Sequence, residues 1–214
     1  MHNLVLLMGA PGSGKGTQGM ILSKFLGIKH FSTGDVFRNM ASENTLEGKE
    51  LSRCIKSGKL VSSDLVNSVV KNFLASKSSD KGCILDGYPR SLDQAKYLLN
   101  NFKGDITVLF FKVDNSIALK RILGRFNCVN CKKIYNKFFM NTQEEGICDV
   151  CNGSDFIFRD DDNTDIILSR LQEYEKETLP VIDFLKDKSK LYEVNANKSS
   201  DEVEADIISI AEMI

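Results

Sequence analysis

Short apolar runs alternate with longer amphipathic stretches along most of this chain of 214 residues. Apolar runs of about four to eight residues predict strands, and apolar residues at helical spacing predict helices. We expect strands over 3–8, 29–32, 82–86, 106–113 and 191–194. We expect helices over 14–26, 35–41, 47–56, 63–76, 91–101, 115–125, 164–187 and 201–213. This alternation predicts an α/β fold built on a mainly parallel sheet.

Two regions break the alternation of strand and helix. Residues 33–61 contain two helical stretches with no strong strand between them. Residues 126–158 lose helical periodicity, hold four cysteines and lead into the acidic residues 160–162. We interpret both regions as insertions in a single α/β core. The expected division is a core over 1–32, 62–125 and 160–214, with one insertion at 33–61 and another at 126–159.

Composition and charge exclude several classes of protein. Hydrophobic residues make up 42% and charged residues 27% of the chain, which is ordinary for a globular protein. The net charge of −1 gives no basic field that would favour nucleic acid or an anionic membrane. No apolar segment approaches the roughly 20 residues that span a bilayer, and the first apolar run is too short for a signal peptide. We therefore expect a cytoplasmic protein with reduced cysteines.

A glycine-rich loop follows the first predicted strand. Residues 9–17 read Gly-Ala-Pro-Gly-Ser-Gly-Lys-Gly-Thr and lead into a predicted helix. Glycines allow successive backbone N–H groups to point at phosphate oxygens, and the N-terminus of the helix adds positive potential. Lys15 can reach the β- and γ-phosphates, and the Thr17 hydroxyl lies near the expected magnesium ion. This loop predicts nucleotide phosphate binding but does not by itself define a reaction.

Arginine is used sparingly in this chain. Of 28 basic residues only seven are arginine, at positions 38, 53, 90, 121, 125, 159 and 170. A planar bidentate cation suits phosphate, so these positions are candidates for phosphate binding. Arg53 has no motif beside it, and we expect it to be a solvated surface charge. The two histidines, His2 and His30, adjoin short apolar segments and are not expected to form a catalytic pair.

Four cysteines lie in two close pairs within the second insertion. Cys128 and Cys131 form the first Cys-x-x-Cys pair, and Cys148 and Cys151 form the second after 16 intervening residues. Four thiolates in this arrangement suit a tetrahedral zinc ion with a structural role, although iron could occupy the same ligands. Two further residues, Cys54 and Cys83, lie outside this cluster and are expected to be packing residues.

The order of the motifs resembles that of adenylate kinases over essentially the whole chain. The matching segments are GAPGSGKGTQ at 9–18, STGDVFR at 32–38, DGYPR at 86–90 with Gln94, and RDD at 159–161. The resemblance implies a P-loop nucleoside monophosphate kinase fold with a central parallel five-stranded sheet, an AMP-binding insertion and a zinc-bearing lid. It also implies reversible, magnesium-dependent transfer of the γ-phosphoryl group of ATP to AMP by a monomer, which gives two ADP.

The resemblance also implies roles for individual residues. The residues expected to bind ATP are Gly12, Ser13, Gly14, Lys15, Gly16, Thr17, Arg121, Arg125 and Lys198. The residues expected to bind AMP are Thr33, Gly34, Arg38, Lys59, Val61, Gly87, Arg90, Gln94, Arg159 and Arg170. The catalytic residues are expected to be Lys15, Arg90, Arg125, Arg159 and Arg170. Asp86 is expected to hold magnesium through water, and the i,i+4 spacing of Arg121 and Arg125 predicts that they share one helix face.

Related kinases provide alternatives within the same class. GTP could be the donor, or a pyrimidine monophosphate the acceptor, but Thr33 together with Gln94 favours AMP. A nucleic-acid-binding or regulatory module with a P-loop and a zinc ribbon is the alternative from another class. Such a module should carry a basic patch, whereas residues 132–149 mix lysines with acidic residues. We expect the lid to close over ATP about hinges near Arg125 and Asp160, and residues 33–61 to close over AMP.

Overall fold

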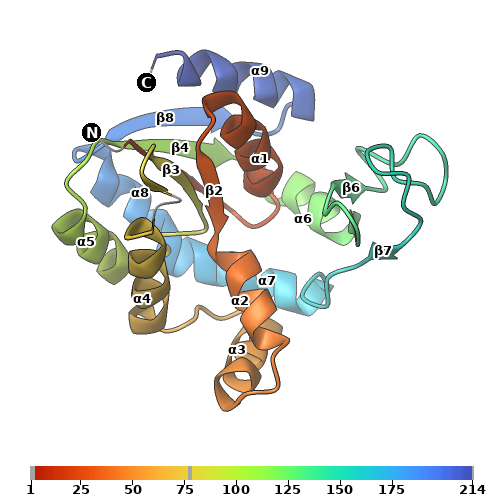
Figure 1. Cartoon of the computed structure of the whole chain (residues 1–214), viewed down its shortest axis with the longest axis horizontal. Helices are drawn as coiled ribbons and strands as arrows, with labels where there is room; N and C mark the ends of the chain where they lie inside the picture. The colour runs from red at the N-terminus through yellow and green to blue at the C-terminus, as the bar shows by residue number, and fades with distance from the viewer. Residues whose placement is uncertain (1–2, 77–78, 214) are drawn as a thin grey trace.

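Five parallel strands form the central sheet of the computed structural model, which describes residues 3–76 and 79–213 (Figure 1). The strand order is β2-β3-β1-β4-β8, and Leu4 of β1 is aligned with Cys83 of β3 and Ile106 of β4. The strands are β1 Leu4–Gly9, β2 Lys29–Ser32, β3 Cys83–Asp86, β4 Ile106–Lys112 and β8 Lys190–Asn195. The predicted α/β class and parallel five-stranded sheet are therefore confirmed. His2 lies outside the described residues.

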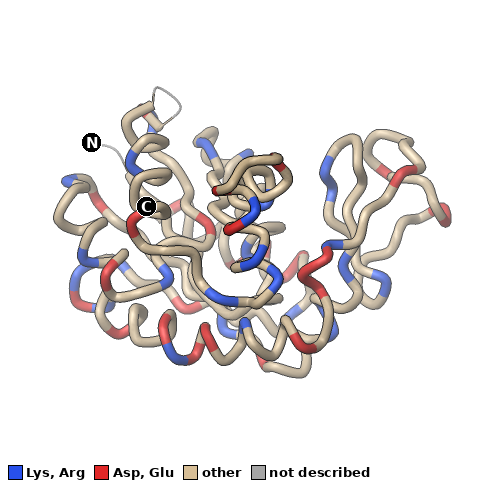
Figure 2. The backbone as a smooth tube through the Cα atoms, turned by 90° about the horizontal axis from the view of Figure 1, so that it is seen from below, with Lys and Arg blue, Asp and Glu red and all other residues tan. Residues whose placement is uncertain are grey.

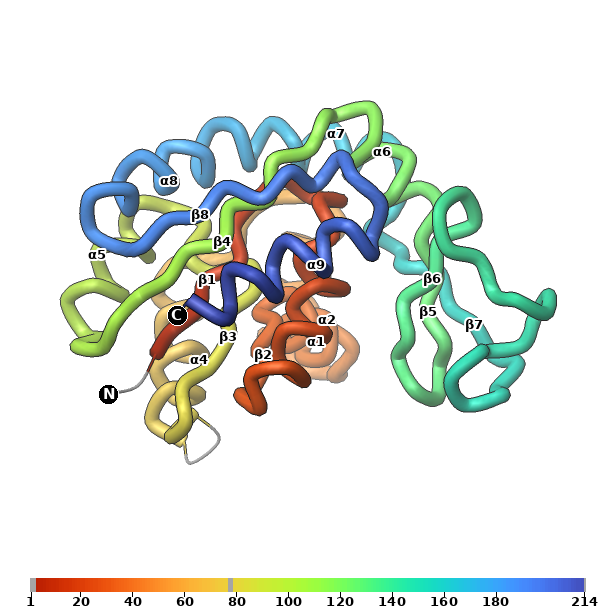
Figure 3. The backbone as a smooth tube through the Cα atoms, turned by 90° about the horizontal axis from the view of Figure 1, so that it is seen from above, coloured from red at the N-terminus to blue at the C-terminus, as the bar shows by residue number. Residues whose placement is uncertain are grey.

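Helices cover both faces of this sheet because its central strands are apolar on both sides (Figure 3). Leu4 and Leu6 of β1 pack toward one face, and Val5 and Leu7 pack toward the other. The first face is covered by α4 (Ser63–Leu74), α5 (Leu92–Asn101) and α8 (Leu179–Lys186). The second face is covered by α1 (Lys15–Leu26) and α9 (Ser200–Ala211). Burying each large apolar side chain contributes about 1.5–3 kcal/mol, so β1 is a rigid support for the loop that follows it.

The first insertion consists of two helices that pack on one another, α2 (Thr33–Ala41) and α3 (Leu46–Ser57). Ser32 caps α2 by accepting a hydrogen bond from the Asp35 N–H, and Thr45 caps α3 in the same way. The insertion returns toward the core at α7 (Thr164–Glu173), where the Ser169 hydroxyl donates to the carbonyl of Ser57 at 2.9 Å. No strand lies between α2 and α3, as the sequence indicated.

The second insertion, called the lid below, contains a small antiparallel sheet that the sequence did not predict. Its strands are β5 (Arg125–Cys128), β6 (Ile134–Asn136) and β7 (Phe156–Ile157), in the order β6-β5-β7. Among the described residues, the lid has one cluster of buried apolar side chains. It consists of Cys128, Tyr135 and Cys148, with Phe126 and Phe156 packed against them. Figures 2 and 3 both show the lid projecting from the rest of the chain.

Two predicted helices differ from the structure. The helix expected over 115–125 ends earlier, as α6 (Asn115–Leu123), and Arg125 is the first residue of β5. The prediction that Arg121 and Arg125 share a helix face is therefore wrong. The physical reason is Gly124: its carbonyl accepts a hydrogen bond from Lys137 of the lid, and a Cβ atom there would meet Asn136 Oδ1 at 2.6 Å.

The helix expected over 164–187 is interrupted by a π-helical turn over Tyr174–Thr178, which separates α7 from α8. Pro180 follows this turn and has no N–H to donate to the preceding turn of helix, so the regular hydrogen-bond pattern cannot continue. Within residues 3–76 and 79–213, no helix combines the length and the apolar character needed to cross a bilayer.

Candidate active site

The phosphate loop joins β1 to α1 and depends on glycine at several positions. Gly12 and Gly14 have φ angles of 80° and 90°, which L side chains rarely adopt. A Cβ atom on Gly12 would lie 2.5 Å from the carbonyl oxygen of Ala118, so the close contact with α6 also requires glycine. No side chain caps α1, and Gly14 precedes its first turn. The N–H groups of that turn are therefore available to an anion.

Lys15 lies over this loop. Its ammonium group donates to the carbonyl oxygens of Gly9 and Ala10, at 2.7 and 2.8 Å, and to Ser13 Oγ at 3.1 Å. Burial lowers the pKa of Lys15 to about 8, and the nearby Asp86 carboxylate opposes this shift. Burying a cation among carbonyl groups is costly unless an anion joins it. A polyphosphate at the loop would supply that anion.

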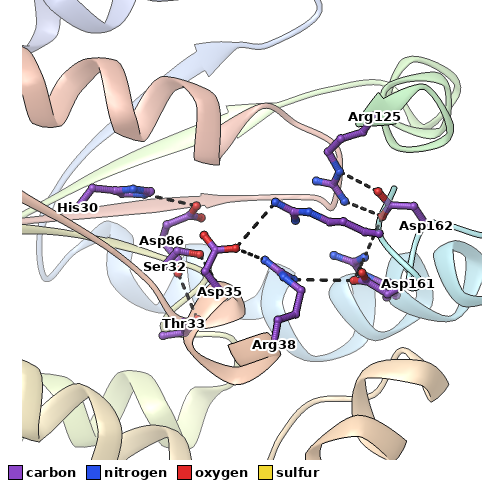
Figure 4. Close-up of polar contacts among 11 residues, drawn as sticks. His30, Ser32, Thr33, Asp35, Arg38, Asp86, Arg125, Asp161 and Asp162 are labelled. Carbon is purple, nitrogen blue, oxygen red and sulfur yellow. Dashed lines mark hydrogen bonds and ion pairs between the residues drawn. The ribbon is translucent and has the colours of Figure 1, made fainter. Parts of the chain in front are cut away.

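Asp86 is the last residue of β3, at the carboxyl edge of the sheet beside β1. Its Oδ2 atom lies 3.5 Å from His30 Nε2, and a Cβ atom on Gly16 would lie 3.4 Å from the same oxygen (Figure 4). Asp86 therefore faces the start of α1, where Thr17 also lines the cavity. A carboxylate and a hydroxyl at this place fit the oxygen ligands and bound waters that magnesium prefers.

Four arginines and three aspartates form a continuous network of opposite charges (Figure 4). Asp35 of α2 lies between Arg38 and Arg159, and Asp161 lies 2.8 Å from Arg170 and 3.9 Å from Arg38. In order, the ion pairs connect Arg159, Asp35, Arg38, Asp161, Arg170, Asp162 and Arg125. This network, called the charge chain below, joins the first insertion to α7 and to both ends of the lid. A further arginine, Arg90, makes no ion pair in this network but lies close enough for the charges of Arg170 and Asp161 to act on its pKa.

The cations of this network are crowded. Burial, followed by the charges of Arg125 and Arg38, lowers the pKa of Arg159 to about 9. Burial, followed by the charge of Arg170, lowers the pKa of Arg90 to about 10. Burial alone would raise the pKa of Asp161, but the surrounding arginines bring it below its ordinary value. All of these groups stay charged at neutral pH, so the site holds an excess of positive charge suited to phosphate.

A cavity of about 1090 Å³ runs between the phosphate loop, the charge chain and the lid. A smaller pocket opens beside it between α2, the end of α3 and the segment that follows β3. Every residue that the sequence assigned to ATP, AMP or magnesium lines one of these two spaces. The residues assigned to ATP and to magnesium, together with Arg159, line the cavity, whereas the smaller pocket alone is lined by Thr33, Lys59, Val61 and Gln94. Both spaces are lined by Gly34, Arg38, Gly87, Arg90 and Arg170.

Thr33 and Gln94 are buried at the end of the smaller pocket, with 2% of each residue exposed. The Thr33 hydroxyl donates to the carbonyl oxygens of Asp86 and Gly87, at 3.2 and 3.0 Å. The side-chain oxygen of Gln94 accepts from the N–H of Arg90 at 2.8 Å. Arg90 is fixed further because its Nε donates to the carbonyl of Gly87 at 2.8 Å. The polar groups of this pocket are thus oriented by the protein itself.

Arg121 connects α6 to the segment that precedes α9. Its guanidinium donates to the carbonyl oxygens of Ala196 and Lys198, at 2.7 and 3.0 Å, and lies 5.8 Å from the ring centre of Phe139. The backbone of Lys198 is therefore held beside the cavity, while its ammonium group is paired with Asp206. Arg53, by contrast, is exposed on α3 and lines neither space, as expected.

The four lid cysteines converge on one point. Their sulfur atoms all lie within 4.8 Å of one another, and the Cys128–Cys151 and Cys131–Cys148 pairs are each 3.5 Å apart. Tetrahedral zinc with Zn–S bonds of about 2.3 Å separates its sulfur ligands by about 3.8 Å. The arrangement fits such an ion. Cys83 is buried in the apolar core, where burial raises the pKa of its thiol to about 12, so its prediction as a packing residue is confirmed. Cys54 is half-buried on α3, and its role as a packing residue stays a prediction.

The two Cys-x-x-Cys turns have the same backbone structure. Lys132 and Asn152, which follow the second cysteine of each pair, have φ angles of 62° and 55°. Each donates its N–H to the carbonyl of the first cysteine of its pair. The N–H groups of Cys128 and Cys148 in turn donate to the carbonyls of Lys133 and Gly153. Non-glycine residues rarely adopt a positive φ, so the lid uses two equivalent strained turns to bring its thiols together.

Comparison with known proteins gives the family. The family model described as adenylate kinase matches residues 7–190. The chain belongs to the adenylate kinase family. Proteins named adenylate kinase from Rickettsia africae and Rickettsia conorii are each 42% identical to it over 207 residues. The protein of that name from Rickettsia prowazekii is 42% identical over 208 residues. Each alignment covers 97% of this chain and 98% of the relative.

The sequence reasoning missed several residues of this adenylate kinase site. Asp35 and Asp161 lie inside the family motifs and Asp162 lies in the acidic run that follows, but the sequence alone predicts no role for them. In the structure these three carboxylates hold the arginines of the charge chain. Their position next to Arg38 and Arg159 in the sequence was the available signal. The sequence also gives no signal for the contact between His30 and Asp86.

Proposed function

We propose that this member of the adenylate kinase family transfers the γ-phosphoryl group of ATP to AMP, reversibly and with magnesium, to give two ADP. The arrangement of the two spaces supports this reaction. The phosphate loop lines the cavity, Thr33 and Gln94 line the smaller pocket, and Arg38, Arg90 and Arg170 line both. Two nucleotides bound in these spaces would present their phosphates to the same arginines.

The reaction requires no general base from the protein. The phosphate of AMP is ionised at neutral pH, so one of its oxygens can attack the γ-phosphorus directly. The bond from that phosphorus to the β–γ bridging oxygen breaks, and ADP leaves with the electron pair. Lys15, Arg90, Arg125, Arg159 and Arg170 align the reactants and neutralise the charge on the transferring group.

Donor binding uses the loop and the two ends of the lid. The N–H groups at the start of α1 and the Lys15 ammonium bind the β- and γ-phosphates. Arg125 binds phosphate after leaving Asp162, while Arg121 and the backbone of Lys198 flank the adenine. Magnesium, when bound, screens the phosphate charge; Asp86 would hold it through water, with the Thr17 hydroxyl beside it.

The strongest support for this proposal is the hydrogen bonding of Thr33 and Gln94 in the smaller pocket, which favours adenine as the base of the acceptor. The proton of the Thr33 hydroxyl is used by two carbonyl groups, so its oxygen is left to accept a hydrogen bond. The side-chain oxygen of Gln94 is used by the Arg90 N–H, so its NH₂ group is left to donate. The pocket therefore offers one acceptor and one donor. The Watson–Crick edge of adenine offers the complementary amino group and ring nitrogen.

Other bases match this pocket less well. Guanine and uracil present a carbonyl oxygen and a ring N–H on the same edge, which reverses both hydrogen bonds. Cytosine has the same pattern as adenine but is a smaller ring, so it would fill the pocket incompletely. A bound GMP or UMP would leave the buried polar groups of Thr33 and Gln94 without hydrogen-bond partners, which costs binding free energy. We therefore expect strong selection against both nucleotides.

A panel of acceptors tests this assignment. With ATP and magnesium constant, initial rates would be measured for AMP, CMP, UMP and GMP. We expect AMP to be the best substrate, CMP a poor one, and UMP and GMP the poorest. A kcat/KM for UMP or GMP equal to that for AMP would overturn the acceptor assignment. A parallel series with GTP in place of ATP tests the donor.

The remaining assignments follow from the same chemistry. The lid holds one structural zinc ion through Cys128, Cys131, Cys148 and Cys151, and elemental analysis would distinguish zinc from iron. Residues 126–159 close over ATP and residues 33–61 close over AMP, which excludes water from the transferring group. The protein acts as a cytoplasmic monomer. Figure 2 supports small-molecule substrates rather than nucleic acid, since acidic and basic residues are interspersed along the chain.

A further inference from the structure

Tyr135 is the only residue outside the four cysteines, among those described, whose side chain hydrogen-bonds to one of the clustered sulfur atoms. It lies on β6, is 1% exposed, and its hydroxyl oxygen is 3.3 Å from Cys148 Sγ. The same oxygen lies 2.9 Å from the N–H of Asp149. The hydroxyl thus lies between a sulfur ligand and the backbone of the turn that carries it.

The direction of these two hydrogen bonds follows from the groups involved. The Asp149 N–H can only donate, so it uses a lone pair of the phenol oxygen. The single proton of the hydroxyl is then free to point at the sulfur. A cysteine that binds zinc is a thiolate, which can only accept. The Tyr135 hydroxyl therefore donates to Cys148 whenever a metal is bound there.

The ring of Tyr135 cannot easily move away from this position. It stacks on Phe126, with ring centres 5.5 Å apart and planes at 19°, and meets the edge of Phe156 at 5.9 Å. Phe126 lies on β5 and Phe156 on β7, so all three strands of the lid hold the ring. Packing of this kind fixes the hydroxyl relative to Cys148 before a metal binds.

We propose that Tyr135 is a positioning residue of the metal site, whose hydroxyl orients the Cys148 thiolate and links the metal to β6 of the lid. The inference rests on the zinc ion of the proposed function and deepens it. Groups that hydrogen-bond to metal ligands commonly change metal affinity by about 10–100-fold when they are removed. Tyr135 takes no part in phosphoryl transfer in this scheme, so its effect is on the lid.

The test compares the Tyr135→Phe variant with wild-type protein and with Tyr192→Phe, which removes a hydroxyl from β8 outside the lid. Zinc affinity would be measured by competition with a chromogenic chelator. We expect the dissociation constant of zinc to rise about 10–100-fold in Tyr135→Phe and to stay unchanged in Tyr192→Phe. Phenylalanine keeps the aromatic packing, and circular dichroism checks that the fold is retained.

Cobalt-substituted protein provides a second measurement that a purely structural role would not affect. Loss of a hydrogen bond raises the energy of the sulfur lone pairs. We therefore expect the thiolate-to-cobalt charge-transfer band to move to lower energy in Tyr135→Phe and not in Tyr192→Phe. Equal zinc affinity and an unchanged cobalt spectrum in Tyr135→Phe would overturn the inference while leaving the zinc assignment intact. Wild-type protein that binds no zinc would overturn the zinc assignment itself, and this inference with it.

Discussion

Arg125 donates two hydrogen bonds to the carboxylate of Asp162, from Nε to Oδ2 at 2.8 Å and from Nη2 to Oδ1 at 2.6 Å. The two residues flank the lid, one at its first strand and the other just after its last, so their pairing closes the base of the insertion. The side chains are 18% and 6% exposed, and the pair is therefore largely removed from water.

Replacement of Asp162 by asparagine should lower the free energy of unfolding by about 2 kcal/mol, because a partly buried guanidinium loses its charged partner. Urea denaturation followed by circular dichroism measures the change. Glu193→Gln is the matched control: it breaks the Lys112–Glu193 pair, whose side chains are 55% and 56% exposed, and should cost less than about 0.5 kcal/mol. Equal losses in the two variants would contradict the buried role of Asp162.

ATP binding should weaken as the pH rises above about 8, the pKa to which burial lowers Lys15 in the free protein. Below this pH the ammonium is charged and attracts phosphate; above it the free protein must take up a proton when it binds ATP. The dissociation constant should rise by up to about tenfold per pH unit until the pKa of the complex is reached.

Calorimetric titration with ATP between pH 7 and 9.5, in buffers of different ionisation enthalpy, measures both affinity and proton uptake. Lys15→Arg is the control, since arginine stays protonated over this range. It should bind ATP more weakly at every pH but with little change in affinity between pH 8 and 9, because the next cation of the cavity to lose its proton is Arg159, whose pKa burial lowers to about 9. A wild-type affinity that stays constant to pH 9.5 would contradict the prediction.

Removal of the Thr33 hydroxyl should impair AMP binding selectively. Thr33→Ala is expected to raise KM for AMP about tenfold, which corresponds to roughly 1.4 kcal/mol, while KM for ATP stays near its wild-type value. Thr33→Ser keeps the hydroxyl and should retain most of the affinity. Steady-state kinetics with each substrate varied in turn would check this. If alanine and serine have the same KM for AMP, the hydroxyl is not a contact of the acceptor.

Loss of one lid thiolate should release the metal and destabilise the lid. Cys151→Ser is expected to reduce the zinc content from about one ion per chain to a small fraction of that, and to lower the melting temperature. Elemental analysis and thermal denaturation measure both effects. Cys54→Ser, which changes a half-buried cysteine of α3, should retain its zinc. Treatment of wild-type protein with a strong chelator should reproduce the loss in Cys151→Ser.

The sequence predicted the central strands β3, β1 and β4 well because they are short and largely apolar runs, as in Leu4–Met8. The valine-rich segment that forms α4 was also predicted as a helix, since its apolar residues repeat at helical spacing. The strands of the lid were not predicted. They are two to four residues long and are held by cysteines and aromatic rings rather than by an alternating pattern.

The residues of the candidate site could be predicted where they belong to a short sequence motif, as Lys15 and Arg90 do. The long-range pairing of charges could not be predicted, because Asp35 meets Arg159, and Asp161 meets Arg38, only after distant segments come together. The assignment of Arg125 to a helix failed for a similar reason. Gly124 ends α6 through contacts with Asn136 and Lys137 of the lid, which no local pattern records.

The charge chain has a consequence for how quickly nucleotides can exchange. Its carboxylates pair with the guanidinium groups that would bind phosphates in the proposed reaction, so we expect Asp35, Asp161 and Asp162 to compete with the substrates for these groups. Because they are part of the same chain, they are present at a high effective concentration. We therefore expect a carboxylate to replace each phosphate that leaves, so that the arginines keep an anionic partner. Such competition would lower the affinity of the site for ADP, and a lower affinity would allow the product to dissociate faster.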